Sequence, residues 1–158
     1  MATIPLTRRG SELLKEELHR LKTVDRHAVI QAIAEARAQG DLSENAEYEA
    51  AKDKQGFIEG RILELESKLA AAQVIDPKTL DAGGRVVFGA TVALEEEASG
   101  HEVTYQIVGD DEADLKQGLV SISSPIARAL IGKGVGDVAE VQAPGGVKHY
   151  EIMAVRYG

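Results

Sequence analysis

The chain has 158 residues, a formal net charge of −8 and a pI of about 5.0. An acidic chain does not bind nucleic acid through its overall field, so any contact with RNA or DNA must be local or made inside a larger partner. The absence of cysteine excludes disulfides, thiol catalysis and thiolate metal sites. With no signal peptide visible and no apolar run as long as a membrane span, we expect a cytoplasmic protein without a membrane segment.

The first part of the chain has the periodicity of a long helix. Thr7 is a candidate N-cap, Gly10 weakens the first turn, and Gly40 suits the position just after the last turn. The heptad register is lost over residues 23–27, where we expect a kink or a skipped residue. The apolar face is expected to consist of Leu14, Leu18, Leu21, Ala28, Ile30, Ile33, Ala34 and Ala36.

A second helix is expected from Ala46 to Ala72, about 40 Å long at about 1.5 Å per residue. Its apolar seam is narrow and heptad-spaced, which favours coiled-coil pairing over burial in a globule. Since only a few polar residues join the two patterns, they predict an antiparallel helical hairpin, although two helices of a larger bundle remain an alternative. The seam residues are Ala51, Ile58, Ile62, Leu65, Leu69 and Ala72.

Pro77 is expected to stop this helix, and residues 77–84 read as a linker to a second domain. After it the apolar pattern becomes that of short strands, and Ser124-Pro125 predicts the start of one short helix. The fold class is therefore α+β, with a coiled-coil hairpin arm over residues 1–76 and a β domain over 77–158. The predicted strands are Val86–Phe88, Thr91–Leu94, Val103–Val108, Leu119–Ile122, Val138–Val141 and Tyr150–Val155.

Two acidic residues, Asp41 and Glu44, fall in the break between the two helical patterns. They fit a capping box, with Asp41 as N-cap and Glu44 at the third helical position. They also suit a shared hard cation, because Mg²⁺ binds one or two protein carboxylates and fills its other positions with water and phosphate oxygens. The end of a hairpin is convex, so in the second interpretation a partner supplies the pocket.

Arg37 and Lys52 flank the same break in an antiparallel hairpin, where they suit phosphate contacts or serve as ordinary solvated charges. The glycine-rich run Gly132–Gly136 lacks the spacing of a phosphate-binding loop and is interpreted as a turn. The four histidines lack zinc spacing and are expected on the surface.

The segment Gly40-Asp-Leu-Ser-Glu-Asn-Ala-Glu-Tyr48, preceded by Ile33-Ala-Glu-Ala-Arg37, resembles the tip signature of bacterial transcript-cleavage elongation factors of the GreA/GreB family. A second signature, Ser121-Ile-Ser-Ser-Pro-Ile-Ala-Arg-Ala-Leu-Ile-Gly-Lys133, follows Ile107-Val-Gly-Asp-Asp-Glu-Ala-Asp114. The two motifs occur in the expected order, and the resemblance runs over essentially the whole chain. The sparse basic charge is more similar to the GreA type than to the GreB type.

This resemblance implies that the hairpin enters the secondary channel of bacterial RNA polymerase, where Asp41 and Glu44 help to hold a catalytic Mg²⁺ of the polymerase. Water then cleaves backtracked RNA near its 3′ end, and Arg37 and Lys52 contact that RNA. No cofactor is expected to bind the isolated chain, which is not itself an enzyme and is expected to be a monomer. The second domain resembles the FKBP-like fold and is expected to dock on the β′ rim of the channel through Ser121, Ser124, Pro125, Ile126 and Arg128.

Two other functions remain open at this point. One alternative is a pure binding module, in which the hairpin occupies the channel and blocks it, as cleavage-inhibiting paralogues do. A prolyl isomerase is the other alternative, but the second domain has too few aromatic residues for a convincing proline pocket: Phe88, Tyr105, Tyr150 and Tyr157.

Overall fold

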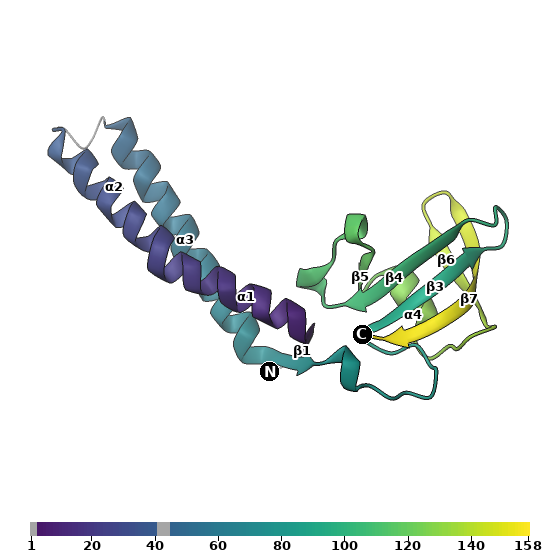
Figure 1. Cartoon of the computed structure of the whole chain (residues 1–158). Coiled ribbons are helices and arrows are strands. Elements are labelled where there is room, and N and C mark those ends of the chain that lie inside the picture. Colours follow the sequence, from purple (N-terminus) through teal and green to yellow (C-terminus); the bar gives the residue numbers. More distant parts are fainter. Residues whose placement is uncertain (1–2, 41–44) are drawn as a thin grey trace. The chain divides into compact units, whose positions relative to one another are not determined.

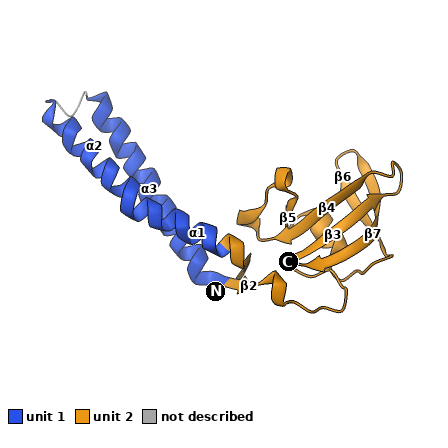
Figure 2. Ribbon diagram, in the orientation of Figure 1, with its two compact units in different colours: residues 1–2, 11–72 blue, residues 3–10, 73–158 orange. Residues whose placement is uncertain are grey.

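The computed structural model describes residues 3–40 and 45–158 (Figure 1). Of these, residues 11–72 form one compact unit, and residues 3–10 together with 73–158 form a second (Figure 2). Within the described ranges, no helix is both long enough and apolar enough to cross a bilayer.

The first unit is an antiparallel helical hairpin, as the sequence predicts (Figure 1). Helices α1 (Arg8–Arg20) and α2 (Arg26–Ala38) are joined end to end by a π-helical turn, Leu21–Asp25. Helix α3 (Ala46–Ala71) returns alongside them. The expected irregularity in the first helical stretch is thus a π-helical turn, and it begins two residues earlier than the sequence indicated.

The seam of the hairpin is apolar and buried. On α3 it consists of the predicted Ala51, Ile58, Ile62 and Leu65. On α2 the predicted Ile33 and Ala36 are buried. The rest of the predicted face is wrong: Val29 is buried, whereas Ala28, Ile30 and Ala34 are exposed. The π-helical turn accommodates one extra residue, which moves the buried face after it one position along the chain. The buried residues that face α3 are Leu14, Leu21, Val29, Ile33 and Ala36.

Two of the predicted helix ends are confirmed. The hydroxyl of Thr7 accepts a hydrogen bond from the backbone N–H of Gly10 at 3.1 Å, so Thr7 caps α1. Gly40 follows the C-cap of α2 with a φ of 120°, a conformation that favours glycine. Helix α3 ends at Ala71, one residue before the predicted end at Ala72 and well before Pro77.

The second unit contains a five-stranded sheet in the order β5-β4-β3-β7-β6. Three of its neighbouring pairs are antiparallel, whereas β4 and β5 run parallel. One short helix, α4 (Pro125–Leu130), packs on the sheet with Ala127 and Leu130 buried in its core. The strands are β3 (Ala90–Glu96), β4 (Glu102–Val108), β5 (Leu119–Ser121), β6 (Val138–Ala143) and β7 (Gly146–Tyr157).

Two features of the second unit differ from the sequence interpretation. Strands β1 (Ile4–Thr7) and β2 (Ala72–Ile75) pair in a small sheet that the sequence did not predict. The predicted strand Val86–Phe88 is wrong, because this stretch ends in a tight turn with Gly89 at a φ of 88°. Val86 is fully buried in the core, so its apolar character reflects packing and not a strand.

Candidate functional site

The bend of the hairpin is the first candidate site. The predicted Asp41 and Glu44 lie outside the described residues, but both flanks of the bend are described. The N-cap of α3 is Asn45, whose side-chain oxygen accepts a hydrogen bond from the backbone N–H of Tyr48 at 3.0 Å. The N-cap of α3 is thus Asn45, four residues after Asp41, and the predicted capping box of Asp41 and Glu44 lies outside the described residues.

Asn45 also ties the two helices together across the bend. Its side-chain nitrogen donates a hydrogen bond to the backbone carbonyl of Ala36 at 2.7 Å. One side chain thus satisfies an orphan N–H at the start of α3 and gives the Ala36 carbonyl a second donor beside the N–H of Gln39. The two flanks of residues 41–44 are held in a defined relation to each other, which the sequence analysis missed. An Asn directly before the helical pattern was the available signal.

Arg37 and Tyr48 face each other on the two sides of the bend. The guanidinium carbon of Arg37 lies 6.0 Å from the centroid of the Tyr48 ring, at the outer limit of a cation–π contact. Such a contact at an exposed site contributes about 0.5–1 kcal/mol, enough to bias the direction of a long side chain. The Arg37 guanidinium is therefore oriented beside the bend.

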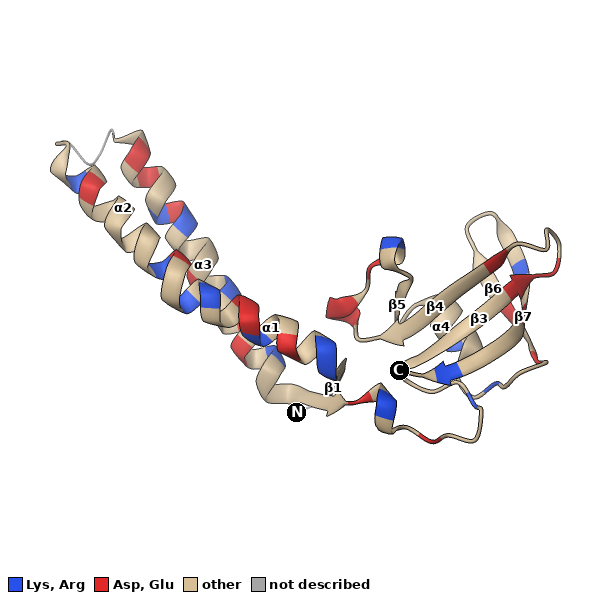
Figure 3. Ribbon diagram, in the orientation of Figure 1, with Lys and Arg blue, Asp and Glu red and all other residues tan. Residues whose placement is uncertain are grey.

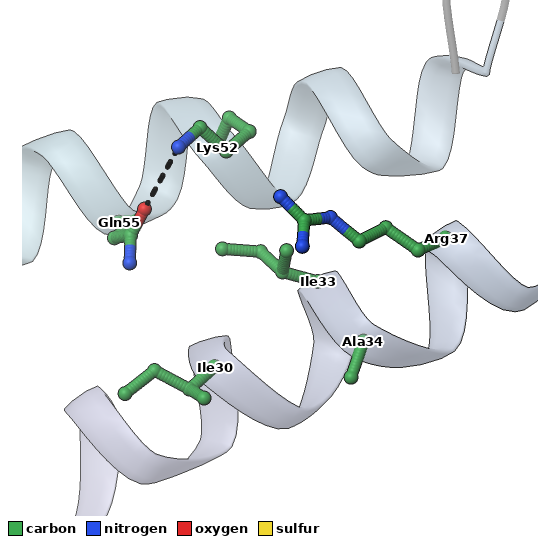
Figure 4. A pocket seen from close by; sticks show the side chains of 6 residues that line it. All are labelled: Ile30, Ile33, Ala34, Arg37, Lys52 and Gln55. Atoms are coloured by element: carbon green, nitrogen blue, oxygen red, sulfur yellow. Dashed lines mark hydrogen bonds between the residues drawn. The ribbon is translucent and has the colours of Figure 1, made fainter.

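The hairpin surface below the bend has a shallow hollow of about 390 Å³ (Figure 4). Lys52 donates a hydrogen bond to the side-chain oxygen of Gln55 at 3.3 Å along the α3 side of this hollow. The structure thus brings the two predicted basic residues, Arg37 and Lys52, to one surface with apolar atoms between them. An apolar floor with cations beside it suits a flat, anionic ligand such as a nucleotide segment. The lining residues are Ile30, Ile33, Ala34, Arg37, Lys52 and Gln55.

The second candidate site is the segment from Ser121 to Arg128 in the second unit. Ser124 is the N-cap of α4, since its hydroxyl accepts a hydrogen bond from the N–H of Ala127 at 3.2 Å. Ile126 is partly buried against the core. Pro125 and Arg128 are exposed, so these two of the predicted residues are the ones available to a partner.

Ser121 belongs to a small polar cluster that the sequence analysis did not detect. Its hydroxyl and that of Ser123 both donate to one carboxylate oxygen of Asp110, the latter at 2.7 Å. These hydrogen bonds, first from Ser121 and then from Ser123, hold the pKa of Asp110 below its usual value. The loop before α4 is thereby fixed to the turn that follows β4.

Elsewhere in the described part of the chain, no three His, Asp or Glu side chains gather in a way that would hold a metal ion.

Fold and site together define the class: a two-unit protein with a helical-hairpin arm and an α+β unit, whose candidate site is the polar bend of the arm. Residues 4–74 match the family described as "Transcription elongation factor, N-terminal", and residues 81–157 match "Transcription elongation factor, GreA/GreB, C-term". The chain therefore belongs to the GreA/GreB family of transcription elongation factors.

Individual relatives agree with this assignment. Over 157 residues the chain is 73% identical to the transcription elongation factor GreA of Verminephrobacter eiseniae and to that of Ralstonia nicotianae, covering 99% of this chain and of each relative. The crystal structure of GreA factor homolog 1 of Thermus thermophilus shares 30% sequence identity over 98% of this chain and 99% of that one, with a TM-score of 0.43. The family assignment rests on the sequence matches.

Proposed function

We propose that this chain inserts the bend of its hairpin into the secondary channel of bacterial RNA polymerase and stimulates the polymerase's own Mg²⁺-dependent cleavage of backtracked RNA. Arrested elongation complexes then resume synthesis. The observation that carries the proposal is the bend itself: its flanks are fixed by Asn45, and the residues between them include Asp41 and Glu44.

The convexity of a hairpin end explains why this chain acts with a partner. A catalytic site is normally concave and excludes water, which the end of two helices does not provide. Asp41 and Glu44 supply carboxylate oxygens of the kind that Mg²⁺ binds, and the polymerase supplies the pocket. Such an ion, when bound, activates water for attack on a phosphodiester. This chain presents the ligands, and the polymerase remains the enzyme.

The hollow beside the bend gives Arg37 and Lys52 a role in the same reaction. Both cations border an apolar floor on one surface of the hairpin, where they can contact phosphates near the 3′ end of the backtracked RNA. The net charge of −8 is repulsive to RNA, so this contact is local and operates once the hairpin is inside the channel.

The second unit is proposed to dock on the β′ rim of the channel through the segment Ser121–Arg128. Pro125 and Arg128 present an exposed surface, while the cap made by Ser124 and the packing of Ile126 maintain its shape. Arg128→Glu in the full chain is expected to weaken polymerase binding without changing the melting temperature, because Arg128 is exposed on α4. Unchanged binding would move the docking surface elsewhere.

The direct test is to add the purified chain to a halted, backtracked polymerase–RNA complex in the presence of Mg²⁺. The proposal predicts 3′-shortened transcripts that resume elongation when nucleotides are added. Transcripts that keep their length would overturn it. A cleavage rate lower than that of the polymerase alone would instead identify a channel-blocking module.

A further inference from the structure

The spacing of the buried seam is uneven on one side of the hairpin only. On α3, Ala51, Ile58 and Leu65 follow one another at intervals of seven residues. On the opposite side, Leu14 and Leu21 are seven apart, but the next buried residue, Val29, comes eight residues later. A regular α-helix would rotate the later face out of the seam by about one residue, or roughly 100°.

The π-helical turn Leu21–Asp25 lies at this eight-residue interval. A π-helical turn absorbs one additional residue, so that Val29 and Ile33 return to the seam and are buried. Within the turn, the hydroxyl of Thr23 donates to the backbone carbonyl of His19 at 2.8 Å, and a hydroxyl that bonds back to the preceding turn often bends a helix. Such turns are rare and costly, and they occur frequently at functional sites.

Two ion pairs connect the helices on both sides of this turn to neighbouring positions of α3. Before the turn, Glu17 accepts two hydrogen bonds from Arg61, at 2.8 and 3.0 Å. After it, Glu59 accepts two from Arg26, at 2.9 and 2.8 Å. Bidentate pairs of this kind fix orientation as well as distance.

Charges of both signs are interspersed along the helices of the arm (Figure 3), and a third ion pair, Lys22–Glu66 at 3.2 Å, joins the π-helical turn itself to α3. Within α3, Glu64 pairs with Lys68 at 2.9 Å and with Arg61 at 3.3 Å. The residues Glu17 of α1 and Arg26 of α2 are nine positions apart in the sequence. Their partners on α3, Arg61 and Glu59, are only two positions apart. The π-helical turn lies between these two attachments.

We propose that the π-helical turn Leu21–Asp25, flanked by the pairs Glu17–Arg61 and Arg26–Glu59 that hold it to α3, is a joint between α1 and α2. The joint determines the direction of α2, the part of the hairpin that leads to the bend. The joint positions the bend and the Arg37–Lys52 hollow, and is not required for the arm to fold. As a statement about positioning, the inference rests on the proposed cleavage function.

Deleting Val24, which is 58% exposed in the π-helical turn, separates positioning from folding. The deletion shortens the interval from Leu21 to Val29 from eight positions to seven, so the seam can close over a regular α-helix. We expect an equal or higher melting temperature and unchanged competition for polymerase, but about 10- to 100-fold slower cleavage at saturating protein, as expected for a small misplacement. Full cleavage activity in the deletion variant, or a lower melting temperature, would overturn the proposal.

A distance measurement tests the joint without reference to activity. The chain has no cysteine, so spin labels can be attached at Lys15→Cys in α1 and Gln31→Cys in α2, both exposed positions on either side of the turn. The proposal predicts that deletion of Val24 shifts the distance distribution between the labels. Superimposable distributions would overturn it. If the wild-type chain itself leaves transcripts uncut, the proposed function fails, and this distance alone decides whether the joint exists.

Charge reversal tests the attachment. Arg26→Glu and Glu59→Arg are each expected to slow cleavage, and the double variant is expected to restore most of the rate because it rebuilds the pair in reverse. Lys15→Glu, the same change of sign at an exposed position of α1, is the matched control and is expected to leave cleavage unchanged. Full activity in both single variants, or a double variant as slow as the singles, would show that the pair does not position the hairpin.

Discussion

Glu112 holds the residue that caps the first helix, Thr7, 105 positions earlier in the chain. Its carboxylate accepts hydrogen bonds from the backbone N–H of Thr7 at 2.9 Å and from the Thr7 hydroxyl, and also from the N–H of Gly109 at 2.9 Å. In a capping box the acid occupies the third position of the same helix. Here that position is Gly10, and a distant segment supplies the acid.

This arrangement reverses the usual effect of replacing glycine in a helix. Alanine normally stabilises a helix by about 1 kcal/mol relative to glycine. A Cβ at position 10 would lie 2.1 Å from the carboxyl carbon of Glu112, so the carboxylate would have to leave its hydrogen bonds. We expect Gly10→Ala to lower stability by about 1–3 kcal/mol. Circular dichroism should show this as a fall of about 2–4 °C in melting temperature for each kcal/mol.

Gly56→Ala is the matched control. Position 56 lies inside α3, and an added Cβ meets nothing within 4 Å, so this change should raise the melting temperature. Combining Gly10→Ala with Glu112→Ala should cost less than the sum of the two single changes, since both remove the same hydrogen bonds. A stabilising Gly10→Ala would contradict the account of this contact.

Asn45 performs two tasks at the bend that two substitutions can separate. Asn45→Asp keeps an oxygen that caps α3 but loses the donor to the Ala36 carbonyl. Asn45→Ala loses both and should destabilise the arm by about 0.5–2 kcal/mol. Hydrogen exchange should show faster exchange of the first amides of α3 in Asn45→Ala, and near-normal protection there in Asn45→Asp. Equal exchange in the two variants would mean that the cap is not the interaction that orders this end.

The ion pairs of the arm predict a loss of stability in acid. The hydrogen bonds from Arg61 lower the pKa of Glu17, and those from Arg26 lower the pKa of Glu59. Because these carboxylates bind protons less readily in the folded state than in the unfolded state, their contribution is complete above the usual glutamate pKa of about 4.3 and disappears as pH falls through the lowered values.

Thermal melts of the full chain at pH 7, 5, 4 and 3 test this sign. The melting temperature, followed by the helical signal, should be nearly constant between pH 7 and pH 5 and should fall below pH 5. Glu17→Gln should reduce the acid-dependent part of the shift, with a cost at pH 7 of about 0.2–1 kcal/mol for a largely exposed pair. An identical pH dependence in the variant would show that the Glu17–Arg61 pair contributes nothing to it.

The hollow beside the bend predicts which cations contact RNA. Arg37→Gln and Lys52→Gln should each weaken crosslinking of the hairpin to the RNA 3′ end and slow cleavage. In each variant the crosslinking should depend less on salt concentration than in the wild-type chain. Lys54→Gln removes the same charge from an exposed position of α3 outside the hollow and should have little effect. Equal losses at all three positions would indicate a general charge effect and not a defined contact.

The sequence predicted the hairpin well because its information is local and periodic. Heptad spacing on α3, the Thr7 cap and Gly40 each determine structure within one or two turns. The choice of Val29 over Ile30 for the seam was missed, because it depends on one extra residue absorbed in a π-helical turn. Strand β1 was missed for a different reason: it is short, and its partner β2 lies almost 70 residues away.

Only part of the candidate site could be predicted from local patterns in the sequence. That Arg37 and Lys52 share a surface follows from helical geometry once the hairpin is assumed. The contacts of Asn45 with Ala36 and of Glu112 with Thr7 depend on side chains meeting across the fold, which no spacing along the chain encodes. Val86 gave a misleading strand signal because a buried loop residue is as apolar as a buried strand residue.

Asp41→Asn in the cleavage assay tests the central claim most directly. Asparagine has nearly the size and shape of aspartate but is a poor ligand for Mg²⁺, and the N-cap of α3 is Asn45 and not Asp41. The account predicts a variant that melts at the wild-type temperature, competes with the wild-type chain for polymerase, and no longer stimulates shortening of backtracked RNA. A variant that cleaves at the wild-type rate would contradict the assignment of this carboxylate to the metal.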